Sequence, residues 1–277
     1  MLEGAGVVSP PKYWTDFIDL AGNVTRKGQA QNIIKSAVSF GEFSNVAHAK
    51  DLFASMLLQK GMPIVSRTDT SYAGRLSDNL GQTVPPTEST LEFYTDFSNP
   101  TKNVYSWNKG FPYSRDAFIV GDLATYFGYA SEILNIQSKN PNLNYDVVKL
   151  PQTKDSTIQA TFGKLWAIAI SKSSKNAATA YVAATSMTSA DFASKISKAV
   201  GLPPVRRDLL VNKPATPFYS SVFYDSALIS RAWLDPFSIT TDQIFKNMIE
   251  DVSSGRSSVN SSSRRAGDEI NFLFKTQ

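Results

Sequence analysis

Few side chains in this 277-residue sequence could carry out chemistry. The chain has no cysteine, which excludes a thiol nucleophile, a disulfide framework and thiolate metal ligands. Its one histidine, His48, cannot form a histidine-rich metal site and is the single candidate for a histidine general base. His48 lies one step past the apolar face of an expected helix, so a partly exposed structural histidine is the preferred interpretation.

Known catalytic motifs are absent from the sequence. It has neither a phosphate-binding loop with Gly-Lys-Ser/Thr nor a nucleophile elbow, and the Gly4–Gly6 segment lacks the third glycine and the preceding strand of a dinucleotide site. Two carboxylates at about 5–9.5 Å could still hydrolyse a glycosidic bond, and sequence separation does not give that distance. We therefore expect a protein that is not an enzyme, with no catalytic residue, no metal and no cofactor; a glycoside hydrolase using a carboxylate pair is the alternative.

Aromatic residues stand next to turn residues and amide or carboxylate side chains at several points. A sugar presents an apolar C–H face and a rim of hydroxyls, so its site needs flat rings to stack on and planar polar groups around them. Taken singly, each aromatic residue is more often part of a core, and Trp14, beside Phe17 and Ile18, is assigned wholly to the core. The clusters that together favour sugar binding are Tyr105–Asn108, Phe127–Glu132, Trp166 and Trp233–Pro236.

Charge and hydropathy exclude other classes of protein. Lys and Arg number 28 against 24 Asp and Glu, and the basic pairs Arg206–Arg207 and Arg264–Arg265 stand isolated rather than in a stripe, so we expect no nucleic-acid partner. The longest apolar run, Leu165–Ile170, is far shorter than the ~20 residues of a membrane span. With 42% apolar and 12% aromatic residues, the chain is expected to be globular.

The apolar periodicity predicts alternating helices and buried strands, and hence an α/β fold with mixed sheets. Two polar stretches, Ser66–Pro86 and Pro214–Tyr224, are predicted to be linkers or surface loops. Strands are predicted at Leu123–Phe127, Tyr145–Leu150 and Leu165–Ile170, the last covered on both faces. Helices are predicted from an Asn45 cap to Gly61, from Thr87, from Ser114 to Gly121, over Ala177–Met187 and Ala190–Val200, after a Thr240–Gln243 capping box, and through Phe274.

Segments along nearly the whole chain carry a family resemblance by their order and spacing. They are Pro10–Trp14, Ser44–His48 leading to Leu57–Gly61, Asp116–Tyr129, Asn140–Pro141, Leu150–Gln152, Trp166–Lys175, Gly201–Arg207 and Ala227–Trp233. The series resembles the extracellular solute-binding proteins of carbohydrate-uptake ABC transporters, the maltose-binding-protein-like class.

This resemblance implies a two-lobed, periplasmic-binding-protein-like type II fold with mixed sheets. Residues 1–157 and 218–277 would form most of the second, C-terminal lobe, and residues 158–217 would be a remnant of the first, N-terminal lobe. Only nine residues precede Pro10, where the family has an export signal and roughly a hundred residues of first lobe. We therefore expect an N-terminally truncated chain with an incomplete first lobe and no export signal of its own.

The resemblance also implies a function, a location and a site. The protein would be an extracytoplasmic receptor, periplasmic or at the cell surface and lipid-anchored in its full-length form. It would act as a monomer that captures a sugar, oligosaccharide or other small polar solute in the cleft between its lobes, close by a hinge and deliver the solute to ABC permease subunits. Its ligand-binding residues would be Asn45, His48 and Asp51 at a helix start, Tyr129 and Glu132 after the cleft-floor strand, Trp166 in the crossing segment, Arg206, Trp233 and, less securely, Trp107.

Overall fold

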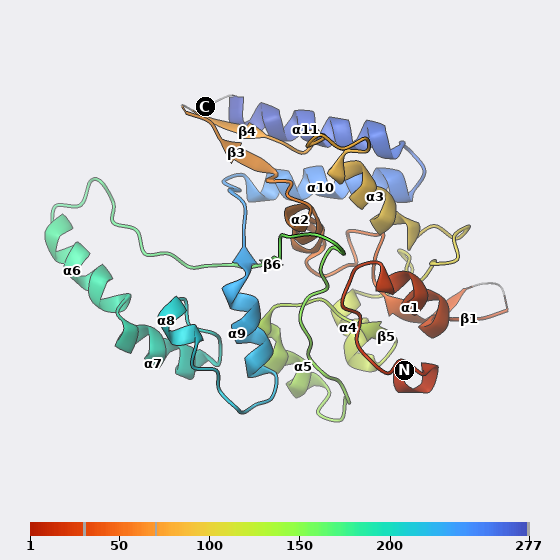
Figure 1. Cartoon of the computed structure of the whole chain (residues 1–277), viewed down its shortest axis with the longest axis horizontal. Helices are drawn as coiled ribbons and strands as arrows, with labels where there is room; N and C mark the ends of the chain where they lie inside the picture. Colours follow the sequence, from red (N-terminus) through yellow and green to blue (C-terminus); the bar gives the residue numbers. More distant parts are fainter. Residues whose placement is uncertain (30–31, 70, 276–277) are drawn as a thin grey trace.

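The computed structural model describes residues 1–29, 32–69 and 71–275. Figure 1 shows a main body of helices around small sheets, and an arm that leaves this body on the left. Helices α10 (Ser238–Ser253) and α11 (Val259–Lys275) lie side by side at the top of this view, with α2 (Ala49–Gln59) below α10 and α3 (Pro86–Asp96) packed against both. The remaining helices of the body are η1 (Glu3–Ala5), α1 (Asp16–Val24), α4 (Ser114–Val120), η2 (Ala130–Glu132), α5 (Ile133–Lys139) and α9 (Ser220–Leu228).

A three-stranded mixed sheet fixes where the loops of the body meet. Its central strand β2 (Ile33–Val38) pairs antiparallel with β1 (Arg26–Lys27) and parallel with β5 (Leu123–Thr125). In the parallel pair, Val38 lies opposite Thr125, so the carboxyl ends of β2 and β5 stand side by side. The segments that follow these two strands therefore start at the same edge of the sheet, which is where α/β proteins commonly bind ligands.

Helix α2 is the centre of the core. Phe53 and Leu57 on this helix are fully buried, and Phe53 packs edge-on against Phe245 of α10 at 6.0 Å. At its far end the buried Gln59 side chain accepts a hydrogen bond from Trp14 Nε1 at 2.6 Å and donates to the carbonyl oxygens of two loop residues. The assignment of Trp14 to the core is thus confirmed, although α1 begins two residues after it.

Helix starts are where the predictions from sequence fail. The residue before α2 is His48, in the left-handed region at φ 55°, whereas Asn45 lies in turns before it and uses its side chain elsewhere. Helix α10 begins at Ser238, so Thr240, the predicted cap, lies inside its first turn, and the capping box does not form because Gln243 Nε2 donates to Asn247 Oδ1 at 2.7 Å instead. The ends at Gly121 and Gly201 are as predicted, since both glycines adopt positive φ.

Two of the three predicted strands are wrong. Leu123–Phe127 is correct but shorter, as β5. Residues 145–150 form no strand and run as extended coil towards the isolated bridge between Tyr13 and Gln152. Residues 165–170 likewise form no strand, because no other described strand pairs with them, and their apolar side chains face solvent. An apolar run predicts burial only where a neighbouring strand is available.

A two-stranded parallel sheet lies where the chain leaves the body. Strand β6 (Thr161–Phe162) stands before the excursion, and its partner β7 (Ser230–Arg231) follows after the chain has returned. Between them lie α6 (Ala177–Met187), α7 (Ala190–Val200), α8 (Arg207–Leu210) and α9 (Ser220–Leu228).

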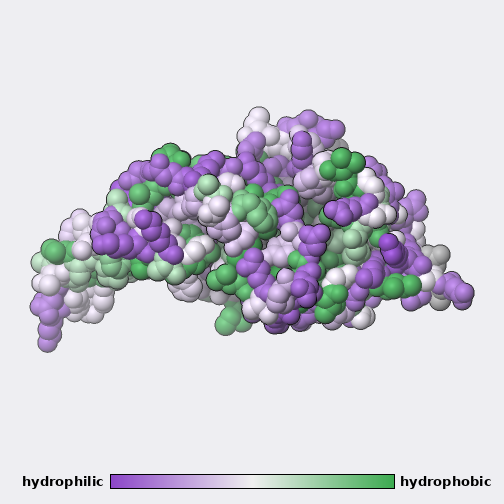
Figure 2. Space-filling model, turned by 90° about the horizontal axis from the view of Figure 1, so that it is seen from below, coloured by the Kyte–Doolittle hydropathy of each residue, from purple (hydrophilic) through white to green (hydrophobic). Residues whose placement is uncertain are grey.

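The arm in Figure 1 consists of α6, α7 and α8 with the segment that leads to them. Both long helices have the predicted bounds, and α6, all of which the structure describes, contains no buried side chain. Figure 2 shows apolar side chains among polar ones along this protruding arm. The exposed apolar side chains include Leu165, Ile168, Tyr181, Val182, Ile196, Val200, Val205 and Val211.

The predicted polar loops contain short elements. Strands β3 (Val65–Arg67) and β4 (Tyr72–Gly74) pair antiparallel, and β4 packs on α11. A side chain at Gly74 would meet the backbone nitrogen of Asn271 at 2.8 Å, so this contact between strand and helix requires glycine. The second stretch, 214–224, includes the start of α9.

Candidate functional site

The loops after β2 and β5 bring three predicted residues together. His48 Nε2 lies 2.9 Å from Glu132 Oε2, and the His48 ring meets the Tyr129 ring edge-on, with centroids 4.8 Å apart. The positive φ of His48 places its ring at the turn into α2, next to the loop that follows β5. The fold therefore joins residues more than eighty positions apart in the sequence.

Glu132 is the most densely bonded carboxylate of this group. Besides His48, it accepts hydrogen bonds from the Tyr129 backbone N–H at 2.9 Å and the Tyr126 hydroxyl at 3.0 Å, and it pairs with Arg115 at 3.4 Å. Burial alone would raise the pKa of Glu132. The hydrogen bonds from His48, Tyr129 and Tyr126 outweigh it and hold that pKa below its usual value. Glu132 is thus an ionised acceptor held in one orientation.

Tyr129 joins this group to α2. Its hydroxyl donates a hydrogen bond to Asp51 Oδ2 at 2.5 Å, and Asp51 also pairs with Lys164 Nζ at 3.1 Å. Lys164 Nζ lies over the Tyr129 ring, 4.7 Å from its centroid. Burial and the bond to Asp51 both raise the pKa of the Tyr129 hydroxyl, so it remains a neutral donor. Tyr129 therefore has a fixed ring with one face covered by a movable lysine.

The charges of the cluster balance. Asp51 and Glu132 supply two negative charges, and Arg115 and Lys164 supply two positive ones. In the part of the chain that the structure describes, no three acidic, histidine or cysteine side chains come together to hold a metal ion. The Arg115 Nε is buried and has no hydrogen-bond partner. A balanced set of fixed donors and acceptors suits the hydroxyl groups of an uncharged solute better than a free ion.

Two other predicted residues form a structural contact. Trp107 donates from Nε1 to Asn45 Oδ1 at 3.1 Å, and its fully buried ring stacks on Phe111 with centroids 4.4 Å apart. The Asn45 amide in turn donates to the carbonyl oxygens of Asn108 and Phe111. The prediction that Trp107 stacks on a ligand is therefore wrong for this structure, because no surface of its ring is accessible, and Asn45 holds the 107–111 loop against the start of α2.

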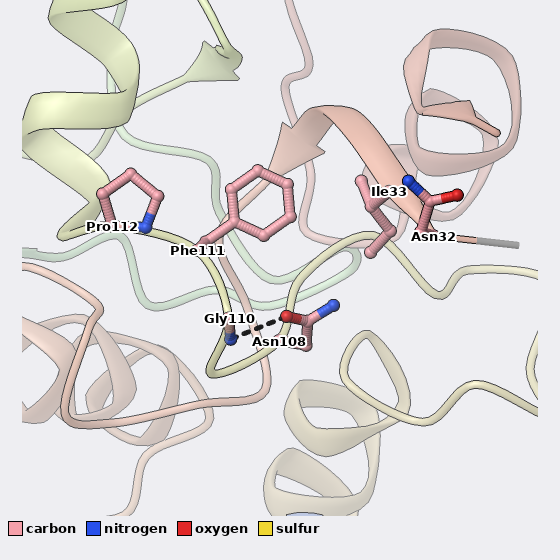
Figure 3. A pocket seen from close by; sticks show the side chains of 6 residues that line it. All are labelled: Asn32, Ile33, Asn108, Gly110, Phe111 and Pro112. Atoms are coloured by element: carbon pink, nitrogen blue, oxygen red, sulfur yellow. Dashed lines mark hydrogen bonds between the residues drawn. The ribbon is translucent and has the colours of Figure 1, made fainter. Parts of the chain in front are cut away.

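A shallow cavity of about 310 Å³ lies between this loop and the start of β2 (Figure 3). Figure 3 shows the Phe111 and Pro112 rings and the Asn32 and Asn108 amides around it. Asn108 is already engaged, since its Oδ1 accepts from the Gly110 N–H at 2.8 Å and its Nδ2 donates to the Tyr105 hydroxyl. None of the predicted site residues lines this cavity.

The remaining predicted residues lie apart from the His48–Glu132 group. Trp166 is 98% exposed on the segment that leads into the arm. Arg206 lies between α7 and α8 and pairs with Asp208 at 2.9 Å. Trp233 is half-buried after β7 and stacks on Phe245 with centroids 6.1 Å apart, and between Trp233 and Tyr129, both described, there is no ring contact.

Trp233 and Tyr129 are nevertheless both connected to α2. Phe245, under Trp233, packs on Phe53, and Asp235 just after Trp233 pairs with Lys50 at 3.0 Å. Asp51, next to Lys50, receives the Tyr129 hydroxyl. The first turn of α2 therefore carries the supports of both aromatic residues.

Three residues of the cluster were not singled out from the sequence. Tyr126 and Arg115 bond to Glu132, and Lys164 covers Tyr129. Tyr126 directly follows β5, so a search for polar residues at strand ends could have found it, whereas β6, the strand before Lys164, was not predicted from the sequence. Arg115 lies in the first turn of α4 and carries no such signal.

The comparisons identify the family of this chain. Residues 1–217 match the sequence profile of the bacterial extracellular solute-binding proteins, and the chain belongs to that family. Its members bind solutes outside the cytoplasm, as the resemblance implied. In the described residues, no helix combines the length and apolar character needed to cross a membrane. No similar protein was found among curated proteins.

Solved structures confirm the periplasmic-binding-protein-like type II fold. The chain is similar to an ABC-transporter solute-binding protein from Thermotoga lettingae bound with α-D-tagatose, at 22% identity and a TM-score of 0.71, covering 98% of this chain and 67% of that one. It is similar to a cyclic maltosyl-maltose-binding protein from Arthrobacter globiformis at 16% identity and 0.71, covering 100% and 68%. It is also similar to UgpB from Mycobacterium tuberculosis, solved with glycerophosphocholine, at 15% and 0.63, covering 98% and 66%.

Proposed function

We propose that this solute-binding protein captures an uncharged sugar or oligosaccharide at the Tyr129–Glu132 cluster and delivers it to an ABC permease. The observation that carries the proposal is the Tyr129 ring, held by Asp51 and His48 and surrounded by a charge-balanced set of hydrogen-bonding groups. A sugar stacks its C–H face on such a ring and directs its hydroxyls to fixed carboxylates and amines. The similar structure with bound tagatose and the similar cyclic maltosyl-maltose-binding protein support this ligand class.

We further propose that the body and the arm belong to different lobes. Residues 1–157 and 218–277 would be the second lobe, and residues 158–217, which leave through β6, would belong to the first. Lys164, just beyond β6, would then cover the Tyr129 ring from the first-lobe side, and Tyr129, Glu132 and Asp51 would form the site on the second lobe. The ion pair between Lys164 and Asp51 would break and re-form as the lobes move.

The remaining parts of the proposal follow from the family and the site. A receptor needs no catalytic group, and we propose that the chain turns over no substrate. We also propose that it acts as a monomer, in the periplasm or tethered to the cell surface by a lipid anchor in its full-length form. Arg206 and Trp166 stay candidate contacts, which a ligand would reach only after the arm has closed on the body.

The test is calorimetric titration of the purified protein with tagatose, maltotriose and glycerophosphocholine, followed by chromatography of each mixture. Saturable binding of a sugar that is recovered intact supports the proposal. Preference for glycerophosphocholine would contradict the neutral-sugar assignment. Cleavage of maltotriose that is lost on Glu132→Gln would replace the receptor by the glycoside hydrolase alternative.

A further inference from the structure

A second cavity, of about 240 Å³, lies at the opposite end of α2 from Asp51. It is lined by the segment before α1, the end of α2, the middle of α3 and the loop after Gln152. Its lining contains two lysines, Lys60 and Lys154, and no carboxylate. None of the residues predicted for sugar binding lines it, so it is a separate site and does not depend on the proposed function.

Lys60 is the central polar group of this cavity. Lys60 is the C-cap residue of α2 and is half-buried. Its Nζ donates a hydrogen bond to the Ser89 hydroxyl at 2.8 Å. Among the described residues, no carboxylate lies within ion-pair distance of Lys60. Burial lowers the pKa of Lys60 to about 8, so at pH 7 the amine is mostly charged and lacks an anionic partner.

The other walls give the cavity an apolar side. Trp14 and Met56 form buried parts of the lining, and Phe93 adds a partly exposed ring. The hydroxyl of Ser89 also bonds to the Pro86 carbonyl, as does that of Thr90. The cavity is thus small, largely apolar and positively charged at one point, which matches an amphipathic anion in size and polarity.

We propose that this cavity is a binding site for a small organic monocarboxylate, whose carboxylate pairs with Lys60 and whose apolar body lies against Phe93, Met56 and Trp14. Lys154 at the rim attracts the anion and remains hydrated. A charge-assisted bond to a half-buried ammonium group is stronger than one to an exposed lysine, so Lys60 supplies the recognition. Neutral molecules of the same shape lack this bond and bind weakly.

The probe is benzoate, with benzamide as its neutral counterpart and inorganic phosphate as an anion without an apolar body. Binding is followed by the nitrogen–proton signal of the Trp14 indole, which lines the cavity. We expect saturable shifts with benzoate, and at least tenfold weaker binding of benzamide and of phosphate. Lys60→Met keeps the apolar stem and removes the charge, and it should weaken benzoate at least tenfold. Lys139→Met, at the exposed end of α5, is the matched control and should bind benzoate as the unaltered protein does.

A second measurement does not require any variant. With a pKa of about 8, roughly one tenth of Lys60 is neutral at pH 7, against roughly one part in three thousand for an ordinary lysine of pKa 10.5. When the protein is treated with a limiting amount of an acylating reagent, mass spectrometry should show that Lys60 is modified at least tenfold faster than Lys139. Benzoate should slow the acylation of Lys60 selectively. Equal protection by benzamide, equal protection by phosphate, or unchanged benzoate binding in Lys60→Met would each overturn the proposal.

Discussion

The hydroxyl of Tyr129 donates a 2.5 Å hydrogen bond to Asp51 Oδ2, and this bond ties the loop after β5 to the first turn of α2. Tyr129 belongs to the loop after the parallel strand pair, and Asp51 belongs to the most buried helix of the body. Since Asp51 is buried, its charge requires this donor together with Lys164. The position of the Tyr129 ring is therefore set by the core.

Substitutions at Tyr129 should separate its ring from its hydroxyl. Tyr129→Phe removes the donor to Asp51 and should lower the free energy of unfolding by about 1–2 kcal/mol, while the ring remains available for stacking. Tyr129→Ala also removes the ring and should weaken maltotriose binding by a further tenfold or more. Chemical denaturation and calorimetry measure the two effects. Equal affinity of the Phe and Ala variants would remove Tyr129 from the site.

Lys164 should act as a cover over Tyr129. In Lys164→Met the ring face loses its cation, and a sugar no longer has to displace the ion pair with Asp51 before it stacks. We expect severalfold tighter maltotriose binding and a weaker dependence of affinity on salt, since the exposed pair is screened by ions. Lys172→Met, further along the same segment, is the control. Weaker binding in Lys164→Met would show instead that the amine contacts the ligand.

Local patterns predicted the helices of this protein and failed where tertiary contacts decide. The bounds of α6 and α7 agree with the predicted ranges because alanine-rich segments and Gly201 define them locally. The strand predicted at residues 165–170 fails because an apolar run does not reveal whether a partner strand is present. Asn45 was predicted to cap a helix from its residue type alone, whereas its side-chain oxygen accepts a hydrogen bond from Trp107, which is distant in the sequence.

In the candidate site, too, some residues were predicted from the sequence and others are set by tertiary contacts. The family resemblance placed His48, Asp51, Tyr129 and Glu132 in one site, and the structure brings these four into one hydrogen-bonded group. Lys164 could not be assigned from spacing, because its contact with Asp51 depends on how β6 leaves the body. Whether a ligand binds this group is still a prediction.

Glu42 should make stability depend on pH. Its carboxyl is nearly buried beside Glu250; burial and that neighbour raise the pKa of Glu42 from 4.5 to about 6, against the opposing attraction of Lys109. Between these values the unfolded chain loses its proton while the folded chain keeps it, so stability falls as pH rises through this window. Glu42→Gln should therefore gain up to about 2 kcal/mol at pH 7 and nothing below about pH 4.

Denaturation of both proteins across pH 4–8 tests this expectation. Glu42→Gln leaves Lys109 its second partner, Glu250, at 3.2 Å, so the ion pair on α10 persists. A loss of stability in the variant at pH 7 would mean that the Glu42–Lys109 pair contributes more than burial costs. Glu92→Gln, at an exposed position of α3, is the control for removal of one acidic charge.

The arm should open before the body. Residues 163–219 include α6, which has no buried side chain, whereas α2 and α10 are anchored in the core. Elements with few buried contacts exchange through local opening at low free energy. Hydrogen exchange should therefore be faster in α6 and α7 than in α2 by two or more orders of magnitude. Uniform protection throughout would contradict both this expectation and the proposed division into lobes.

Two substitutions of Trp233 should separate its effect on sugar binding from its effect on stability. Its ring stacks on Phe245, so Trp233→Ala removes a core contact as well as a candidate stacking surface. We expect the Ala variant to lose on the order of 1–3 kcal/mol of maltotriose binding, one to two decades in Kd, together with a lower midpoint of thermal unfolding. Trp233→Phe keeps a ring on Phe245 and should recover most of the stability but only part of the affinity. If both variants bind maltotriose as the unaltered protein does, Trp233 belongs to the core alone, and the sugar site reduces to the cluster around Tyr129.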